Sequence, residues 1–257
     1  MAKLARRLTQ PRSSGSLLKS KPQKVQRSSY VESQSRRNII TDEYQEQLNK
    51  EFDRQLKNLL EKGYPKIANL KAEDLIKVTE PLRRKLTELP MPNIEIREAR
   101  IPFVLVVKND LIPAETAMPL IEIKGQSGYV DMRPVDSKSF TSIEGLQIPT
   151  SPVYLVVDVD TGQETLNVTP FNALRKLQRQ NRLPLVIDEG VALVTHFPEV
   201  LIDRKNYNCF SLLGSRRDDQ RVPAMWMSYK KPRLGWCWDN NPHTWLGSAS
   251  CDRRIGV

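Results

Sequence analysis

Val153-Tyr-Leu-Val-Val-Asp-Val159 is a run of β-branched and apolar residues with one charged member, and Ile101-Pro-Phe-Val-Leu-Val-Val107 is a second such run. Apolar runs of this length without polar alternation are typical of strands that are buried on both faces. Shorter runs of the same kind, bounded by Gly, Pro and Asp, lie at residues 120–124, 128–131, 209–213 and 224–229. Together these runs predict a mixed β-sheet over residues 94–257.

The N-terminal side of this region has helical spacing instead. Apolar residues recur every three or four positions over 42–60, where Asp42 is placed to cap a helix, and again over 72–89. Pro81 is expected to break the second helix, because proline lacks the amide hydrogen that a helix interior uses. The two apolar stripes predict a helical hairpin over residues 41–92.

Short helices are also expected within the sheet region. Thr169-Pro170 combines a capping residue with a first-turn proline, and Asp188 is expected to cap a second short helix that ends near Pro198. Helices that precede a sheet and interrupt it briefly are typical of the α+β class. We therefore expect a single α+β domain over residues 41–257.

The positive charge of the chain is concentrated at its N-terminus. The net charge is +10, and residues 1–38 hold ten Lys or Arg but only one acidic residue, Glu32. This segment has few large apolar side chains, so we expect a disordered basic tail over 1–40. Its expected partner, through residues 1–38, is anionic, either a nucleic acid or an acidic surface. A solubilising tail and an organellar transit peptide are the alternatives.

Cysteine usage and hydropathy indicate the compartment. Three cysteines in 257 residues do not form a disulfide framework, which is typical of a reducing environment. The sequence has neither a run long enough to cross a membrane nor the apolar core of a secretory signal. We expect a soluble, cytoplasmic protein.

The densest cluster of chemically distinctive residues lies between Arg233 and Cys251, which includes three of the four tryptophans. This C-terminal Trp-rich unit is expected to be an ordered loop or short-strand unit that packs on the core. One hypothesis is a zinc site, since three thiolates and an imidazole form a valid tetrahedral set. Its ligands would be Cys209, Cys237, His243 and Cys251, although the sequence lacks a CxxC knuckle. The alternative is that the cysteines are small buried residues.

The same unit allows a catalytic and a ligand-binding interpretation. Cys237 with His243 as its base would form a nucleophilic pair. A pocket for a small polar or anionic ligand would use side chains from this unit and from the preceding loop, namely Arg216, Trp236, Trp238, Asn241 and Trp245. In a strand, both tryptophans that flank Cys237 point to one face, either as core residues or as a stacking platform.

Asp158-Val-Asp-Thr-Gly162 is similar in composition to the start of a calcium-binding loop. A calcium loop of the EF-hand type needs a Glu at its twelfth position, where this chain has Thr169. We interpret the segment as the end of a strand followed by a tight turn.

Several long motifs of unusual composition resemble an uncharacterised bacterial family of cytosolic proteins, described only as a domain of unknown function. The motifs include Glu189-Gly-Val-Ala-Leu-Val-Thr-His-Phe-Pro-Glu199, Leu234-Gly-Trp-Cys-Trp238 and Asn241-Pro-His-Thr-Trp-Leu-Gly-Ser-Ala-Ser-Cys251. The resemblance spans about residues 50 to 253 and leaves the basic N-terminal segment outside it. It implies no activity, ligand or partner.

These observations favour a binding or accessory protein, in which the C-terminal unit recognises a partner or ligand and the basic tail attracts an anionic partner. The alternative is an enzyme that acts on a small polar or anionic substrate with His243 and either Cys237 or Arg216. A purely structural role for the C-terminal unit is a third hypothesis.

The basic tail generates the first prediction. The full chain should bind RNA, DNA or anionic vesicles with an affinity that falls steeply as salt is raised, because each neutralised phosphate releases a counterion. Deleting residues 1–38 should abolish this binding in a fluorescence-anisotropy or vesicle co-sedimentation assay. Equal binding by the truncated chain would assign the anion affinity to the folded body instead.

Overall fold

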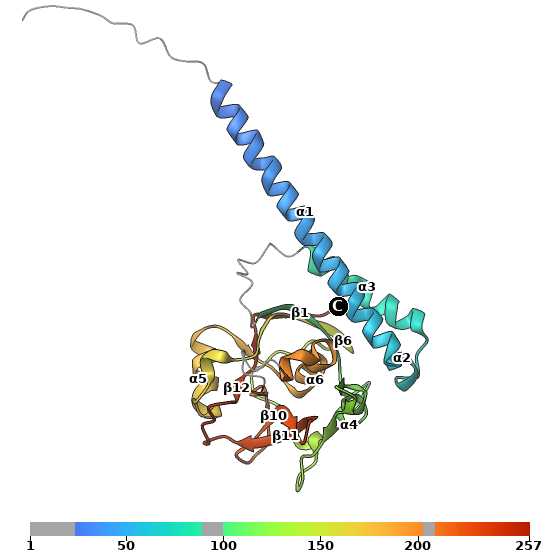
Figure 1. Ribbon diagram of the computed structural model, residues 1–257, viewed down its shortest axis with the longest axis vertical. Coiled ribbons are helices and arrows are strands. Elements are labelled where there is room, and N and C mark those ends of the chain that lie inside the picture. Colours follow the sequence, from blue (N-terminus) through green and yellow to red (C-terminus); the bar gives the residue numbers. More distant parts are fainter. Residues whose placement is uncertain (1–23, 89–99, 203–208) are drawn as a thin grey trace, which may run out of the picture. The chain divides into compact units, whose positions relative to one another are not determined.

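The computed structural model describes residues 24–88, 100–202 and 209–257 and, within the first helix, side chains from residue 42 onward (Figure 1). The chain divides into two compact units, Met1–Glu43 and Tyr44–Val257. Helices precede several antiparallel and mixed sheets, which confirms the α+β class. Of the expected disordered tail over 1–40, residues 1–23 lie outside the described residues, whereas residues 24–40 belong to a helix and not to a disordered segment. Helix α1 (Lys24–Glu61) begins earlier in the chain than the Asp42 cap predicted.

The helical hairpin is confirmed. It consists of the C-terminal half of α1, the short helix α2 (Tyr64–Ile67) and α3 (Ala72–Thr87). The two apolar stripes pack together in the core through Leu48, Phe52, Leu56 and Leu59 on α1 and Leu75, Leu82 and Leu86 on α3. The prediction that Pro81 breaks the second helix is wrong, because α3 continues through it. Burial of the leucines on both sides of Pro81 outweighs the one hydrogen bond that proline removes.

Two five-stranded sheets form most of the remaining structure. The first contains β1 (Arg100–Val107), β6 (Val153–Asp160), β13 (Ser250–Cys251) and β7 (Leu183–Pro184) in that order, and β14 (Arg253–Ile255) also pairs with β6. All its pairs are antiparallel. The uninterrupted runs in β1 and β6 are buried as predicted: Phe103–Leu105 and Val153–Val156 have no exposed surface.

The second sheet has the order β12 (Gly247–Ser248), β8 (Phe210–Ser211), β10 (Arg221–Ser228), β11 (Lys231–Trp238) and β4 (Tyr129–Val130). Its β11–β4 and β12–β8 pairs are parallel, so this sheet is mixed. Two small two-stranded pairs complete the strands: the hairpin of β2 (Glu122–Ile123) with β3 (Gln126–Ser127), and the long-range pair of β5 (Thr141–Ser142) with β9 (Ser215–Arg216).

Short helices cover the first sheet. Helix α6 (Ile187–His196) contacts β1, and its Glu189 accepts a hydrogen bond from Tyr154 of β6 at 3.0 Å. Helix α4 (Ala114–Ala117) contacts α6, and α5 (Pro170–Arg179) contacts β7. Thr169 caps α5 as predicted, because its hydroxyl accepts a hydrogen bond from the Asn172 amide at 3.3 Å. Among the described residues, no helix is both long enough and apolar enough to span a membrane.

The cap of α6 is not Asp188, as the sequence suggested, but the preceding Val186. Glu189 accepts the Val186 amide at 2.9 Å, which closes the first turn. At the other end, the ring of His196 lies 2.9 Å from the Leu105 carbonyl through Nε2 and 3.3 Å from the Asn58 side-chain nitrogen through Nδ1. Since the amide nitrogen can only donate, Nε2 carries the proton. Burial lowers the pKa of His196 to about 3, so the ring is neutral.

Strand β1 lies at the edge of its sheet, and the side chain of Gln55 on α1 covers part of that edge. Its amide nitrogen donates to the Phe103 carbonyl at 3.0 Å and its oxygen accepts from the Leu105 amide at 2.7 Å. Gln55 is fully buried. It therefore supplies the two bonds that a neighbouring strand would otherwise supply, and it anchors α1 on the sheet.

We predict that Gln55→Leu lowers the free energy of unfolding by about 2–4 kcal/mol, because two buried backbone groups lose their partners. Gln47→Leu is the matched control, since Gln47 is exposed on the same helix and should change stability by less than about 0.5 kcal/mol. Urea denaturation followed by circular dichroism measures both. Equal effects of the two substitutions would contradict this role for Gln55.

Candidate functional site

The C-terminal Trp-rich unit is ordered and packed on the core, as the sequence predicted. Trp236 and Trp238 lie on one face of β11, with ring centroids 5.0 Å apart, and the Arg221 guanidinium lies 4.6 Å and 5.0 Å from them. Trp238 is 41% exposed and forms part of the surface, whereas Trp236 is half-buried and packs against the core. Cys237 points to the opposite face, as strand alternation requires.

The structure brings Cys237 close to Arg216, whereas the His243 ring packs against Trp245. The Arg216 guanidinium lies 3.2 Å from the Asp239 carboxylate and interacts electrostatically with the Cys237 thiol. The His243 ring packs against Trp245 with centroids 5.0 Å apart. Among the described residues no hydrogen bond or ion pair joins His243 to Cys237 or Arg216, and Asn241 lies exposed in the turn after β11.

The four proposed zinc ligands do not converge. Within residues 24–88, 100–202 and 209–257, no group of three or more His, Cys, Asp or Glu side chains lies close enough to hold a metal ion. Cys251 is fully buried in β13 of the first sheet, whereas Cys209 and Cys237 belong to the second sheet or its border. Burial raises the pKa of Cys209 to about 11 and the pKa values of Cys237 and Cys251 to about 12.

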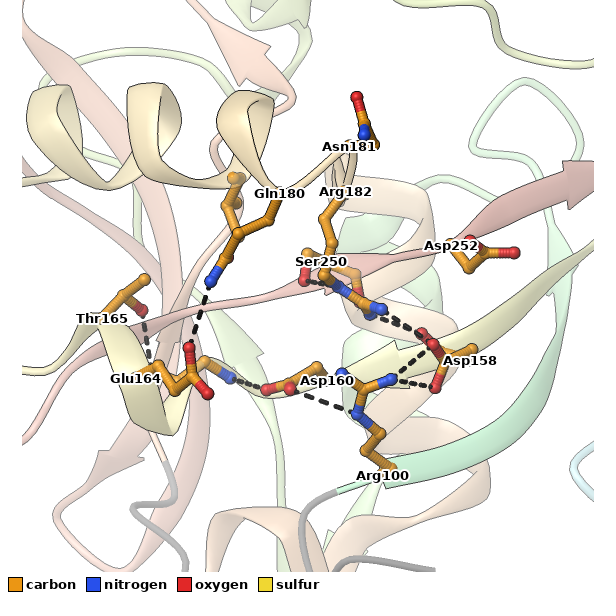
Figure 2. A pocket seen from close by; sticks show the side chains of 12 residues that line it. Arg100, Asp158, Asp160, Glu164, Thr165, Gln180, Asn181, Arg182, Ser250 and Asp252 are labelled. Atoms are coloured by element: carbon orange, nitrogen blue, oxygen red, sulfur yellow. Dashed lines mark hydrogen bonds and ion pairs between the residues drawn. The ribbon is translucent and has the colours of Figure 1, made fainter. Parts of the chain in front are cut away.

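A different site lies beside the end of β6, where a cleft of about 370 Å³ opens (Figure 2). We call it the Asp158 cleft. It is lined by Arg100, Asp158, Asp160, Gly162, Glu164, Thr165, Leu177, Gln180, Asn181, Arg182, Ser250 and Asp252. Leu177 is the only aliphatic side chain among them, so the lining is strongly polar.

Asp158 interrupts β6 at the wall of this cleft. Its backbone has a φ of 55°, in the left-handed region that an aspartate inside a strand rarely adopts. The register places Pro102 opposite it on one neighbouring strand and Asp252 on the other. Proline has no amide hydrogen to pair, so the regular ladder weakens at this row of residues.

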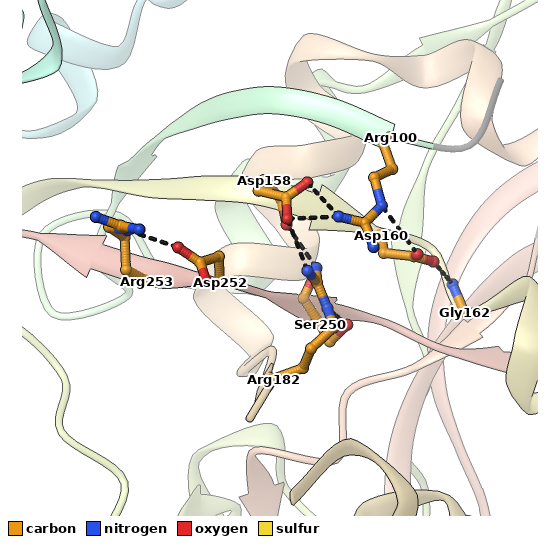
Figure 3. Close-up of polar contacts among 8 residues, drawn as sticks. All are labelled: Arg100, Asp158, Asp160, Gly162, Arg182, Ser250, Asp252 and Arg253. Carbon is orange, nitrogen blue, oxygen red and sulfur yellow. Dashed lines mark hydrogen bonds and ion pairs between the residues drawn. The ribbon is translucent and has the colours of Figure 1, made fainter. Parts of the chain in front are cut away.

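Two guanidinium groups bind the Asp158 carboxylate (Figure 3). Arg100 donates from Nη1 to both carboxylate oxygens at 2.9 Å and 2.6 Å, and Arg182 donates from Nη1 at 2.8 Å. Arg182 also donates to the Asp158 carbonyl at 2.5 Å and to the hydroxyl and carbonyl of Ser250 at 2.8 Å and 3.2 Å. This nearly buried side chain therefore joins the segment after α5 to both β6 and β13.

The turn after β6 forms the next part of the wall. The Asp160 carboxylate accepts the Gly162 amide at 2.7 Å, and Gly162 has a φ of 93°. A Cβ atom on Gly162 would lie 2.2 Å from the Ser248 nitrogen, so only glycine fits against β12 here. The predicted strand end with a tight turn is thus confirmed, and the turn packs directly on the Trp-rich unit.

Three carboxylates complete the open side. We call Asp160, Glu164 and Asp252 the rim carboxylates. Glu164 accepts from the Gln180 amide at 3.1 Å and lies 3.7 Å from Lys176, while Asp252 pairs with Arg253 at 2.6 Å. These contacts leave the Glu164 and Asp252 side chains 66% and 41% exposed.

The model of a protein family described as "Family of unknown function (DUF5701)" matches residues 58–257. The chain belongs to this family. No curated protein and no solved structure matches the chain. The matched region of this DUF5701 member contains every residue of the Asp158 cleft and every residue proposed from the C-terminal unit.

Sequence reasoning identified the Asp158 motif as a strand end but not as part of a site. Arg182 is far from it in sequence, and nothing in the local pattern pairs the two. A usable signal was nevertheless present, because a carboxylate within an apolar strand must find a buried partner.

The thiol environments generate a prediction about reactivity. All three cysteines are unpaired, and their raised pKa values keep them protonated at neutral pH. We expect iodoacetamide to leave the folded protein unmodified at neutral pH over a time in which it fully alkylates the protein unfolded in urea, as read by intact mass. Rapid alkylation of native Cys237 would restore the nucleophile hypothesis.

Proposed function

We propose that this DUF5701 protein is a binding protein that holds a small, strongly polar ligand in the Asp158 cleft. The observation that carries the proposal is a cleft of about 370 Å³ with a single aliphatic side chain in its lining. Its volume lies at the lower end of the range of small-molecule sites. Ser250 comes from the C-terminal Trp-rich unit, where the sequence analysis placed recognition, and Asp252 directly follows that unit.

The wall of the cleft is held in place before any ligand arrives. Asp158 has a left-handed backbone, which costs on the order of 1–3 kcal/mol, and such residues cluster at functional sites. Arg182 fixes this residue through its carboxylate and its carbonyl. A rigid wall reduces the entropy lost on binding, which supports a recognition role.

The pKa values favour binding over catalysis by a cysteine. A thiol with a pKa of about 12 is almost entirely protonated at neutral pH, whereas a nucleophilic cysteine needs its thiolate. Among the described residues, no hydrogen bond joins Cys237 to His243, whose ring packs against Trp245 instead. The enzyme hypothesis that uses this pair therefore has little support.

A second candidate function is recognition of a partner by the aromatic surface of the C-terminal unit. Trp238 and Trp245 are 41% and 47% exposed, and exposed tryptophans are enriched where proteins bind partners. We propose, as a further expectation from sequence, that the basic residues 1–38 attract an anionic partner. The three unpaired cysteines support a reducing location such as the cytoplasm.

The proposal is tested with the full chain and an Arg182→Met variant. Each is equilibrated with the small-molecule fraction of a cell extract and desalted, and released molecules are identified by mass spectrometry. Because Arg182 contacts both Asp158 and Ser250, the variant should lose the molecules that the natural chain retains. Trp238→Ala is the control and should retain them. Identical profiles for all three proteins would refute binding in the cleft.

A further inference from the structure

Most of the exposed aromatic side chains come from two neighbouring segments of the chain. Among residues 42–88, 100–202 and 209–257, the exposed aromatic residues are Phe171, Tyr229, Trp238 and Trp245. Tyr229 lies in the turn between β10 and β11, and the other three belong to the first turn of α5 and to the loop that follows β11. We call Phe171, Trp238 and Trp245 the stacking surface.

Backbone hydrogen bonds hold these two segments together. The Phe171 amide donates to the carbonyl of Asp239, the residue after Trp238, at 3.2 Å. An amide of the segment that precedes α5 donates to the His243 carbonyl at 2.7 Å, and the His243 ring packs against Trp245. The three exposed rings are therefore carried by one packed unit. A single exposed aromatic residue is ordinary, whereas several on one unit indicate a binding surface.

The same unit carries positive charge that the protein does not neutralise. Arg175 and Arg179 are exposed on α5, and neither forms an ion pair or a side-chain hydrogen bond within the described part of the chain. The guanidinium carbon of Arg175 lies 4.3 Å from the centroid of the Phe171 ring. Over α5 and the neighbouring segments 215–221 and 236–245, the chain has six Lys or Arg and three Asp. Its charge complements an anionic partner.

The combination of ring faces with arginine selects among anionic partners. A single-stranded nucleic acid offers both phosphates and unstacked bases, and bases stack on aromatic side chains and on guanidinium planes. An acidic peptide would use the charge alone. A lipid surface favours rings surrounded by apolar side chains. The loop between Trp238 and Trp245 instead exposes Asn240, Asn241 and Thr244.

We infer that the stacking surface binds a single-stranded nucleic acid. Its bases stack on the three exposed rings, and its phosphates pair with Arg175 and Arg179. This inference rests on the second candidate function and names the partner of that surface. In the full chain, the basic residues 1–38 supply the attraction expected from the sequence, and the stacking surface supplies the contact with the bases. Two contacts with one strand raise the affinity above that of either contact alone.

The test uses the full chain and two fluorescently labelled strands of equal length, oligothymidine and the same sugar-phosphate backbone without bases. The two strands carry the same charge, so the difference between their affinities reports the bases. Fluorescence anisotropy should show oligothymidine binding about tenfold more tightly, because stacking one base contributes a factor of about ten or more. Equal affinities for the two strands would overturn the inference.

Trp238→Leu and Trp245→Leu, made separately, should each weaken oligothymidine binding about threefold to tenfold and leave the strand without bases unchanged. Leucine keeps apolar bulk at both positions, and circular dichroism checks that each variant is folded. Tyr229→Leu is the matched control, since Tyr229 is 91% exposed at the opposite end of the β10–β11 ladder. It should change neither affinity. Equal loss in the control and in both tryptophan variants would overturn the inference.

The phosphate contacts have their own test. The double variant Arg175→Gln, Arg179→Gln should weaken the binding of both strands and reduce its dependence on salt, because each lost phosphate contact releases one counterion fewer. Lys230→Gln with Lys231→Gln removes the same charge at the exposed turn between β10 and β11 and is the matched control. A salt dependence that falls equally in both double variants would contradict the assigned phosphate contacts.

Failure of the inference and failure of the proposed functions give different results. Arg182→Met should leave strand binding unchanged, because Arg182 lies in the Asp158 cleft, so the extract experiment tests the cleft independently. If the tryptophan variants bind oligothymidine normally but lose binding to vesicles of phosphatidylserine and phosphatidylcholine, the partner class is wrong and recognition by the aromatic surface stands. If neither probe responds to either tryptophan, the inference is overturned and the second candidate function loses its support.

Discussion

A buried ion pair between Glu189 and Arg254 fixes the C-terminal segment, and the Asp158 cleft depends on it. Arg254 donates to the two Glu189 oxygens at 2.6 Å and 2.9 Å, and the Tyr154 hydroxyl donates to the same carboxylate at 3.0 Å. Glu189 has no exposed surface. Removing one member of such a pair leaves an uncompensated buried charge, which costs on the order of 3–5 kcal/mol. The pair therefore determines where β14 lies along β6, and with it the positions of Ser250 and Asp252.

The sequence correctly predicted those elements whose local pattern of apolar side chains is enough to determine their secondary structure. The run at 153–159 has enough apolar residues to be buried whatever packs on it, and the stripe on α1 has a clear helical period. Strands β12 and β13 are different, since Gly247, Ser248 and Ser250 have little intrinsic preference for strands. Their conformation is set by the partners that they meet, β8 on one side and β6 and β7 on the other.

The candidate site was predicted less well, for a related reason. The sequence analysis concentrated on the chemically distinctive residues, namely tryptophan, cysteine and histidine. In the structure these residues do not meet: Trp238 and Trp245 are exposed, Cys251 is buried in the first sheet, and Cys237 lies in the second sheet. The Asp158 cleft is made of ordinary Arg, Asp and Ser residues, whose significance comes only from their convergence. Arg182 and Asp158 meet because the chain after α5 comes back to the edge of the first sheet. The local sequence around either residue contains no signal that predicts this long-range contact.

The cleft wall also departs from what stability alone would favour. A buried ion pair is often no more stable than apolar residues of similar volume, and the rest of β6 is rich in valine. At one row of the sheet, however, the chain has Asp158 with a left-handed backbone opposite Pro102, and both features weaken strand pairing. The weakened row lies at the cleft, and Arg182 takes up the carbonyl of Asp158. The neighbouring rows of the same sheet have neither a left-handed residue nor a proline. Because both unfavourable features occur together at the row that borders the Asp158 cleft, we attribute them to recognition rather than to packing.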